Sequence, residues 1–198
     1  DQTPAFITAY NGDTGAEYWH SSYTISNGST TALGDIDNDG KTELIGQRWG
    51  GGLIAYNGDG SIKFESDFPP THSGSNDSDI HLVDLEGDGE VEILLDNHVI
   101  NFDGTQRFSI GPNRKASPTV ADLDSDGVQE IIIGSSAYTA TGDLIWSNAN
   151  ATGRSTIVDL DLDGTPEIVL SGSSIYALSA DGQLLWQVPS FFSRGGGA

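Results

Sequence analysis

The segment VDLDLDGTPEIV, residues 158–169, decides the fold, because three near-copies of it occur earlier in the chain. The copies are LGDIDNDGKTELI at 33–45, VDLEGDGEVEIL at 83–94 and ADLDSDGVQEII at 121–132. They align without gaps, and their first acidic positions are 49, 38 and 37 residues apart. Self-similarity at this period is typical of repeat architectures. The chain is therefore a repeat array.

A second unit recurs between these segments. It consists of a short strand, a turn of small or polar residues, and a second strand that ends in an aromatic side chain. This pattern predicts a β-hairpin. The unit covers residues 6–19, 53–64, 99–108, 137–146 and 175–186.

Each repeat then holds four strands in about 37 to 49 residues, which is the period of a propeller blade. A parallel β-helix would need a shorter period, and a helical solenoid would need apolar residues at a 3.6-residue spacing. The sequence predicts an all-β fold, a β-propeller of four four-stranded blades with an additional N-terminal β-hairpin. The longer first interval contains a polar insertion, Pro69 to Asp79, which is expected to form a surface loop.

The four segments also have the pattern of metal-binding loops. Carboxylates occupy positions 1, 3, 5 and 9, and glycine occupies position 6, where a sharp bend is needed. Oxygen ligands without histidine or cysteine favour Ca²⁺, and like-charged groups this close would repel one another without a cation. We predict about four calcium ions. The predicted ligands are Asp35, Asp37, Asp39, Glu43, Asp84, Glu86, Asp88, Glu92, Asp122, Asp124, Asp126, Glu130, Asp159, Asp161, Asp163 and Glu167.

These loops resemble the FG-GAP/VCBS-type repeats of integrin α-subunit propellers, bacterial surface proteins and some fungal lectins. The resemblance extends from about Phe6 to Val188, whereas the literal FG and GAP signatures survive only as fragments such as Ile133-Gly134-Ser135. It implies that each calcium loop joins the first two strands of a blade and that the aromatic hairpin supplies the outer two. Some family relatives are polysaccharide lyases.

The two kinds of hairpin occur in unequal numbers, because five outer hairpins accompany four calcium hairpins. We predict that residues 1–22 form an extra outer hairpin and a possible inter-subunit element. Residues 23–198 are then a four-bladed calcium-binding propeller or a fragment of a larger one. Three explanations remain open for the extra hairpin: upstream blades are missing, the hairpin packs on its own ring, or it docks on a neighbouring subunit.

Two sets of aromatic residues could do more than stabilise the fold. Trp19, Trp146 and Trp186 end equivalent hairpins, and this repetition favours packing between blades over stacking on a sugar. Trp49 lies outside the repeat, in Arg48-Trp49-Gly50-Gly51-Gly52, and an exposed tryptophan there could stack on a sugar ring.

The composition limits the classes of partner. The net charge is −21, from 29 acidic and 8 basic residues, so phosphates of nucleic acids and anionic membranes would be repelled. No run of 18 apolar residues is present, and membrane insertion is not expected. The absence of methionine indicates a processed or excised product, as after removal of a signal peptide. Sequons begin at Asn27, Asn76 and Asn150.

We expect no enzyme and no catalytic residue, because the obvious carboxylate pairs lie in the calcium loops and no nucleophile motif or P-loop is present. The predicted function is a non-enzymatic, secreted or cell-surface propeller that acts in adhesion or self-assembly. Its partners would be copies of itself, as a homo-oligomer or fibre, another surface protein, or a glycan. The alternative is a carbohydrate-binding, lectin-like propeller or the propeller part of a polysaccharide-degrading enzyme.

Overall fold

The computed structural model describes residues 5–26, 30–67, 79–111 and 117–189. The insertion predicted to be a surface loop lies outside these ranges up to residue 78, as do the sequons that begin at Asn27 and Asn76. Every regular element in the described part is a β-strand, so the predicted all-β class is confirmed. The described part holds no helix with the length and apolar character of a membrane span.

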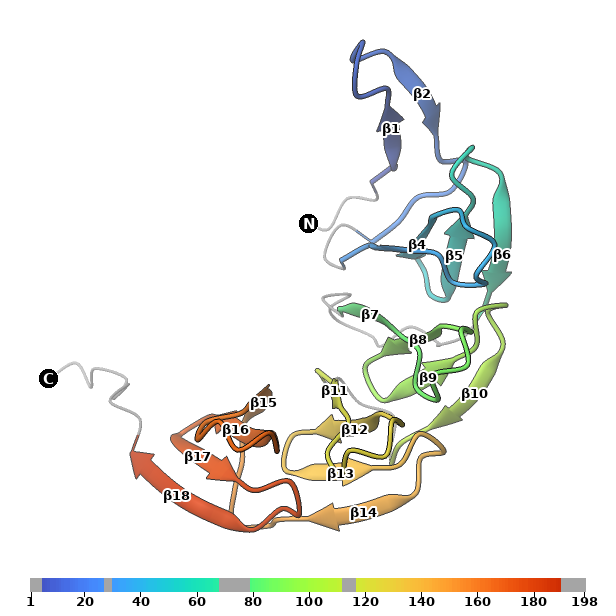
Figure 1. Cartoon of the computed structure of the whole chain (residues 1–198). Helices are drawn as coiled ribbons and strands as arrows, with labels where there is room; N and C mark the ends of the chain where they lie inside the picture. Colours follow the sequence, from blue (N-terminus) through green and yellow to red (C-terminus); the bar gives the residue numbers. More distant parts are fainter. Residues whose placement is uncertain (1–4, 27–29, 68–78, 112–116, 190–198) are drawn as a thin grey trace, which may run out of the picture. The chain divides into compact units, whose positions relative to one another are not determined.

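The strands form one two-stranded and four four-stranded antiparallel sheets, each of which follows the chain order (Figure 1). The two-stranded sheet is the hairpin β1 (Thr8–Tyr10) and β2 (Glu17–His20). The first four-stranded sheet is β3 (Ala32–Gly34), β4 (Glu43–Gln47), β5 (Leu53–Tyr56) and β6 (Ile62–Ser66). The second is β7 (Ile80–Val83), β8 (Glu92–Leu95), β9 (His98–Ile100) and β10 (Gln106–Ser109). The third is β11 (Thr119–Ala121), β12 (Glu130–Ile133), β13 (Ser136–Tyr138) and β14 (Leu144–Ser147). The fourth is β15 (Arg154–Val158), β16 (Glu167–Ser171), β17 (Ser174–Leu178) and β18 (Leu184–Pro189).

In each four-stranded sheet the acidic loop joins the first two strands and the aromatic hairpin supplies the last two. The two hairpins pair in one repeated register, for example Ile45 with Ala55 and Val169 with Ala177. The middle strands β4, β5, β8 and β9 are largely buried and rich in branched apolar residues, which suit a strand covered on both faces. The predicted order of the two hairpins along each sheet is therefore confirmed.

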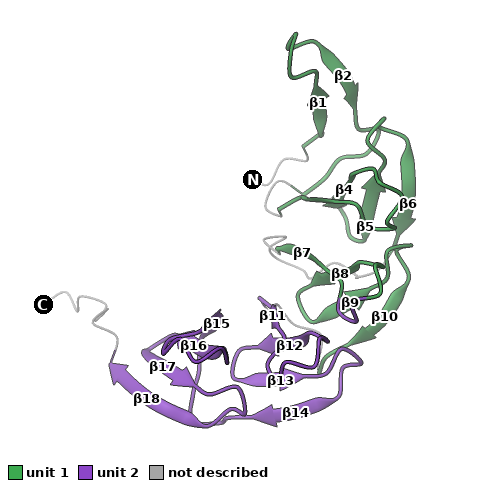
Figure 2. Ribbon diagram, in the orientation of Figure 1, with its two compact units in different colours: residues 1–84, 88–115 green, residues 85–87, 116–198 purple. Residues whose placement is uncertain are grey.

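The chain divides into two compact units (Figure 2). The first comprises residues 1–84 and 88–115, and the second comprises residues 85–87 and 116–198. In the first unit, β3–β6 and β7–β10 share an apolar core that includes Ile45, Leu53 and Ile93. In the second, β11–β14 and β15–β18 share a core that includes Ile132 and Leu170. Burial of these faces is the main stabilising contribution of such layered sheets.

A repeated interlock joins successive sheets inside each unit. The aromatic ring at the end of one outer hairpin lies against a glycine in the turn of the next. A Cβ at these glycines would lie 2.4–2.6 Å from ring atoms, and the pairs are Trp19 with Gly60, Phe64 with Gly104, and Trp146 with Gly182. The indoles also donate from Nε1, Trp19 to the Gly58 carbonyl at 3.1 Å and Trp146 to the Ala180 carbonyl at 2.9 Å. The prediction that this aromatic position serves packing is confirmed at these three residues.

The N-terminal hairpin packs on the first four-stranded sheet of its own chain. Trp19 stacks on Tyr56 with ring centroids 5.6 Å apart, and Ile7 lies against the same apolar cluster. Isolated bridges link Ile25 to Ala5 and to Arg48. The hairpin is thus joined to this sheet by the same type of interlock that joins the later sheets within each unit. A contact of residues 1–22 with a second subunit stays a prediction.

Candidate metal centres

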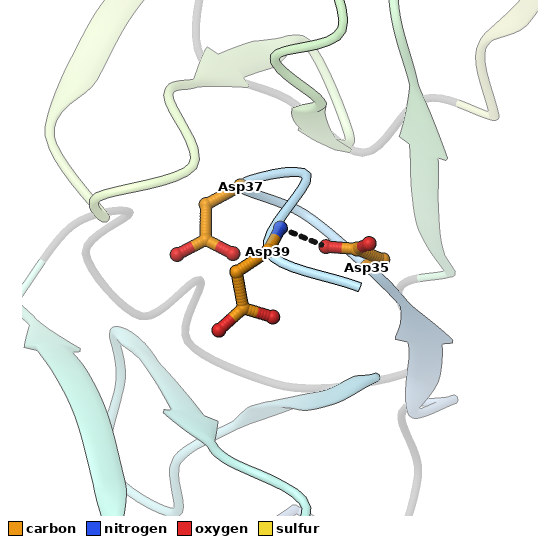
Figure 3. A group of neighbouring side chains, drawn as sticks. All are labelled: Asp35, Asp37 and Asp39. Atoms are coloured by element: carbon orange, nitrogen blue, oxygen red, sulfur yellow. Dashed lines mark hydrogen bonds between the residues drawn. The ribbon is translucent and has the colours of Figure 1, made fainter. Parts of the chain in front are cut away.

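The first aspartate of each acidic loop holds the loop closed. In the first loop its carboxylate accepts hydrogen bonds from the backbone N–H groups of Asp39 at 3.1 Å and Gly40 at 2.8 Å. The same two bonds recur in the other three loops, at Asp84, Asp122 and Asp159. The loop therefore curls around the side chain of its first residue, and Figure 3 shows this for Asp35, Asp37 and Asp39.

Two left-handed residues give each loop its curvature. Position 6 is glycine in all four loops, with φ between 84° and 92°. Position 4 is also left-handed but is glycine only in the second loop; the others have Asn38, Ser125 and Leu162, with φ of 58° to 63°. Asparagine adopts this region readily, whereas a leucine pays a steric cost there. The sequence predicted the glycine at position 6 and missed the bend at position 4.

The glutamate at position 9 connects the loop to the sheet. Glu130 begins β12 and is buried, and its Oε2 accepts the N–H of Leu123 at 2.7 Å. Glu167 accepts the N–H of Leu160 at 2.7 Å, and Glu43 accepts that of Ile36 at 3.2 Å. One oxygen of each buried carboxylate is thereby fixed, and the whole group is held at the base of its loop.

Three loops bring carboxylate oxygens within 4.8 Å of one another. Calcium binds oxygens at about 2.3–2.6 Å, so ligands on opposite sides of the ion are roughly 5 Å apart. The all-oxygen donor sets and their spacing fit Ca²⁺. In the first loop, Asp37 Oδ1 is also buried without a hydrogen-bond partner, and a bound cation would coordinate this oxygen. The groups are Asp35 with Asp37 and Asp39, Asp122 with Asp124 and Glu130, and Asp159 with Asp161 and Glu167.

The remaining predicted ligands stay predictions. Glu43, Asp126 and Asp163 belong to these three loops but lie outside the closely spaced groups. The second loop forms no such group among the residues that the structure describes. Its predicted ligands are Asp84, Glu86, Asp88 and Glu92.

Residues 35–95, which contain the first two acidic loops, match the family model of the FG-GAP-like repeat. This segment is similar to FG-GAP-like repeats. No curated protein sequence matches the chain significantly. Among solved structures, that of the V. cholerae biofilm matrix protein Bap1 is 27% identical over 94% of this chain, with a TM-score of 0.75. A Bacillus licheniformis rhamnogalacturonan lyase is 22% identical over 93% of the chain, with a TM-score of 0.71, and shares the fold. The chain spans 33% of the Bap1 structure and 38% of the lyase.

The two acidic loops of the first unit each lie beside a basic side chain that the sequence analysis missed. Lys63 Nζ, on β6, lies 2.5 Å from Asp37 Oδ2 and 3.4 Å from Glu43 Oε1. Arg107, on β10, lies 2.9 Å from Glu92 Oε1. Burial lowers the pKa of Lys63, but the hydrogen bond to Asp37 and the charge of Glu43 outweigh burial and raise it overall. Both bases directly precede the aromatic residue that ends their hairpin, which is the signal that could have identified them.

The second unit has apolar residues at the equivalent positions, Ile145 and Leu185. A cavity of about 240 Å³ opens beside Glu130, with Ile145 and Trp146 among its lining residues. Burial and the charges of the neighbouring aspartates raise the pKa of Glu130, although the hydrogen bond from the Leu123 N–H lowers it in part. The carboxylates of this loop thus repel one another without an internal cation to offset them.

We expect Lys63→Met to strengthen calcium binding at the first loop about tenfold. Removing a positive charge about 3 Å from the carboxylates removes a repulsion of a few kcal/mol at most, reduced by solvent screening. Methionine retains the apolar stem that packs beside the loop. Calorimetric calcium titration of the variant and the parent protein measures the change.

Lys41→Met is the matched control. Lys41 Nζ lies 3.1 Å from Asp39, but its side chain is exposed, so water and salt already screen its charge. An equal gain in affinity in both variants would contradict the specific role of Lys63.

The predicted sugar-stacking residue is Trp49, which is 40% exposed in the turn between β4 and β5. Its neighbour Arg48 is largely buried and bonds to Glu65, to Asp67 and to the Ser66 carbonyl. The guanidinium therefore supports the turn.

Proposed function

We propose that this chain is part of a non-enzymatic, extracellular β-propeller that is stabilised by calcium and acts in adhesion or self-assembly. The observation that carries the proposal is the likeness to the biofilm matrix protein Bap1, at 27% identity over 94% of the chain. The four four-stranded sheets would be successive blades, with the acidic loops fixing the inner strands of each.

The buried carboxylates support a structural role for the loops. Glu130 and Glu167 each accept a hydrogen bond from a backbone N–H of their own loop through one carboxylate oxygen. An acid or base in catalysis needs a carboxyl group that reaches a substrate proton. These two groups instead lie at the base of a tight turn, where a metal ion or the loop backbone is their natural partner.

The propeller also has the properties expected outside the cell. A structural calcium site of this type binds in the submillimolar to millimolar range, which suits extracellular concentrations. The strong negative charge would keep single modules apart, and bound calcium would lower that repulsion. Calcium would thus favour both the fold and contact between copies.

A carbohydrate-binding propeller is the second candidate, and the half-exposed Trp49 favours it. An aromatic ring in an exposed turn offers a flat apolar face to a sugar. The alternative of a propeller that serves a polysaccharide-degrading enzyme rests on the shared fold alone.

The test combines sedimentation velocity with glycan-array binding, both with calcium and with excess EGTA. We expect association that increases with protein concentration in calcium and is lost in EGTA. A monomer that binds glycans, and loses them on Trp49→Ala, would replace our proposal with the lectin function. Release of unsaturated sugars from a polysaccharide would overturn the non-enzymatic assignment.

A further inference from the structure

The first acidic loop holds a lysine side chain of its own sheet. Lys63 directly precedes the aromatic residue that ends its hairpin, and its stem is largely buried. Its ammonium group lies 2.5 Å from Asp37 Oδ2 and 3.4 Å from Glu43 Oε1. These carboxylates occupy positions 3 and 9 of the loop. The repeat can therefore form a binding site for a primary ammonium group.

The third sheet has the same two carboxylates without the lysine. Asp124 and Glu130 occupy positions 3 and 9 of its acidic loop, and both line the cavity of about 240 Å³. Ile145, which stands at the position of Lys63, lines the same cavity. Among the residues that the structure describes, neither Asp124 nor Glu130 forms an ion pair with a basic side chain. The cavity thus lies where the lysine of the first sheet would be.

A second difference between the repeats enlarges the cavity. The turn between β17 and β18 lies beside β14, where Trp146 Nε1 donates to the Ala180 carbonyl at 2.9 Å (Figure 1). In the second sheet the equivalent of Ala180 is Phe102, since each stands two residues before the turn glycine, Gly182 or Gly104. Phe102 packs on the apolar core of the first unit, whereas Ala180 lines the cavity. A methyl group in place of a phenyl ring leaves space that close packing would otherwise fill.

The charge of the cavity favours a cation even when calcium is bound. Three carboxylates line it, those of Asp124, Glu130 and Asp181. Asp122 and Asp126 belong to the same acidic loop. One calcium ion would therefore change a formal charge of −5 to −3, so that an anionic ligand would still be repelled.

The remaining walls suit an aliphatic stem. Leu123, Ile145 and Trp146 contribute apolar surface, and an indole also attracts a cation that lies over its face. At about 30 Å³ for each water molecule of the liquid, 240 Å³ corresponds to about eight waters. This space accommodates an ammonium group together with a carbon chain as long as that of lysine.

We propose that this cavity binds a primary ammonium group on an apolar stem of about four or five carbons, as in an aliphatic amine or a lysine side chain. The ammonium group would lie between the carboxylates at positions 3 and 9, as that of Lys63 does in the first sheet. The stem would lie against Ile145 and Trp146. One copy of the chain contains the whole cavity, so the site is independent of the proposed function in adhesion or self-assembly.

Titration with n-pentylamine at constant ionic strength tests the site, with calcium present. We expect a saturable shift of the NMR signal of the Trp146 indole N–H, with a dissociation constant of roughly 1 mM for a ligand this small. n-Pentanol has the same stem without the charge, and it should bind at least about tenfold more weakly. Equal affinities for the amine and the alcohol would overturn the assignment of an ammonium site.

The source of the ammonium group is identified by a parallel titration with N-acetyl-lysine N-methylamide. An affinity at least equal to that of pentylamine would assign the site to a lysine side chain of another protein. Binding of pentylamine alone would assign it to a free amine. Both results support an ammonium site, whereas binding of neither compound would overturn it.

Two variants fill the cavity in different ways. Ile145→Lys supplies an ammonium group from the chain itself, and Ala180→Phe supplies the ring that the second sheet has at this place. We expect each to weaken pentylamine binding at least about tenfold. Ile145 is 49% exposed, so the new lysine can keep its charge in water while the chain folds. Ala180→Phe keeps the test valid if Ile145→Lys fails to fold.

Leu185→Lys is the matched control for charge. It adds the same lysine at the equivalent position of the fourth sheet, and Leu185 is absent from the lining of the cavity. This variant should bind pentylamine like the parent protein. An equal loss in Leu185→Lys and Ile145→Lys would mean that the amine responds to overall charge alone, and would overturn the proposal. Parent-like binding by folded Ile145→Lys and Ala180→Phe would overturn it as well.

Sedimentation velocity separates this site from the proposed function. A protein that associates in calcium but binds no amine would retain the proposed function and lose the ammonium site. A protein that stays monomeric and binds pentylamine in the cavity would do the reverse.

Discussion

Removing calcium with excess EGTA is expected to lower the melting temperature by roughly 3 to 15 °C. A ligand that binds only the folded state stabilises it in proportion to its saturation. At about 1 mM calcium, a dissociation constant of about 0.1 to 1 mM gives roughly 0.4 to 1.4 kcal/mol per site. Three acidic groups then contribute roughly 1 to 4 kcal/mol, and each kcal/mol shifts the melting temperature by about 2 to 4 °C in a chain of this size.

Thermal melting followed by far-ultraviolet circular dichroism measures the shift. Asp124→Asn with Asp161→Asn, which changes one carboxylate in each of two acidic groups, should remove most of the calcium increment and leave the melting temperature in EGTA nearly unchanged. Excess magnesium is the control for ionic strength, because it holds its own water shell and suits these loops less well. A melting temperature that stays constant after prolonged dialysis against EGTA would contradict the calcium assignment.

Gly182→Ala is expected to destabilise the second unit by about 2 to 4 kcal/mol. The new Cβ would lie 2.4 Å from the ring of Trp146, so the indole must move away from the Ala180 carbonyl. Overpacking typically costs about 1 to 3 kcal/mol. The backbone at φ +80° adds about 1 kcal/mol for any residue with a Cβ.

The matched control is Gly111→Ala. Gly111 has φ +66° but open space within 4 Å, so only the backbone cost of about 1 kcal/mol applies. Urea unfolding of both variants gives the two free energies. Equal losses would mean that the ring and the turn do not form the interlock, and a larger loss for Gly182→Ala would confirm it.

The repeat made the sheets predictable from the sequence. Hairpins such as residues 53–64 carry their own strand and turn signals, and the acidic segments mark the inner pair. Local patterns of this kind survive folding because each sheet is formed from one continuous stretch of chain. The role of the glycine at position 6 could also be predicted, because only glycine adopts that bend without a steric cost.

The differences between the loops could not be predicted in the same way. Lys63 reaches Asp37 across 26 residues, and this pairing depends on how β6 returns beside the loop. The left-handed Leu162, which is 86% exposed, gives no sequence signal because leucine rarely adopts this conformation. The loop overrides the preference of that residue, since the hydrogen bonds to Asp159 fix the turn.

The basic side chains beside the loops of the first unit affect how the protein responds when the calcium concentration falls. Lys63 and Arg107 are side chains of the protein itself, so their positive charges cannot dissociate from the loops. The loops around Glu130 and Glu167 depend instead on calcium ions from the solvent. As calcium is depleted, amide hydrogens of residues 122–130 and 159–167 would exchange with solvent before those of residues 35–43. The acidic loops of the second unit would therefore loosen at calcium concentrations at which the first acidic loop still keeps its shape.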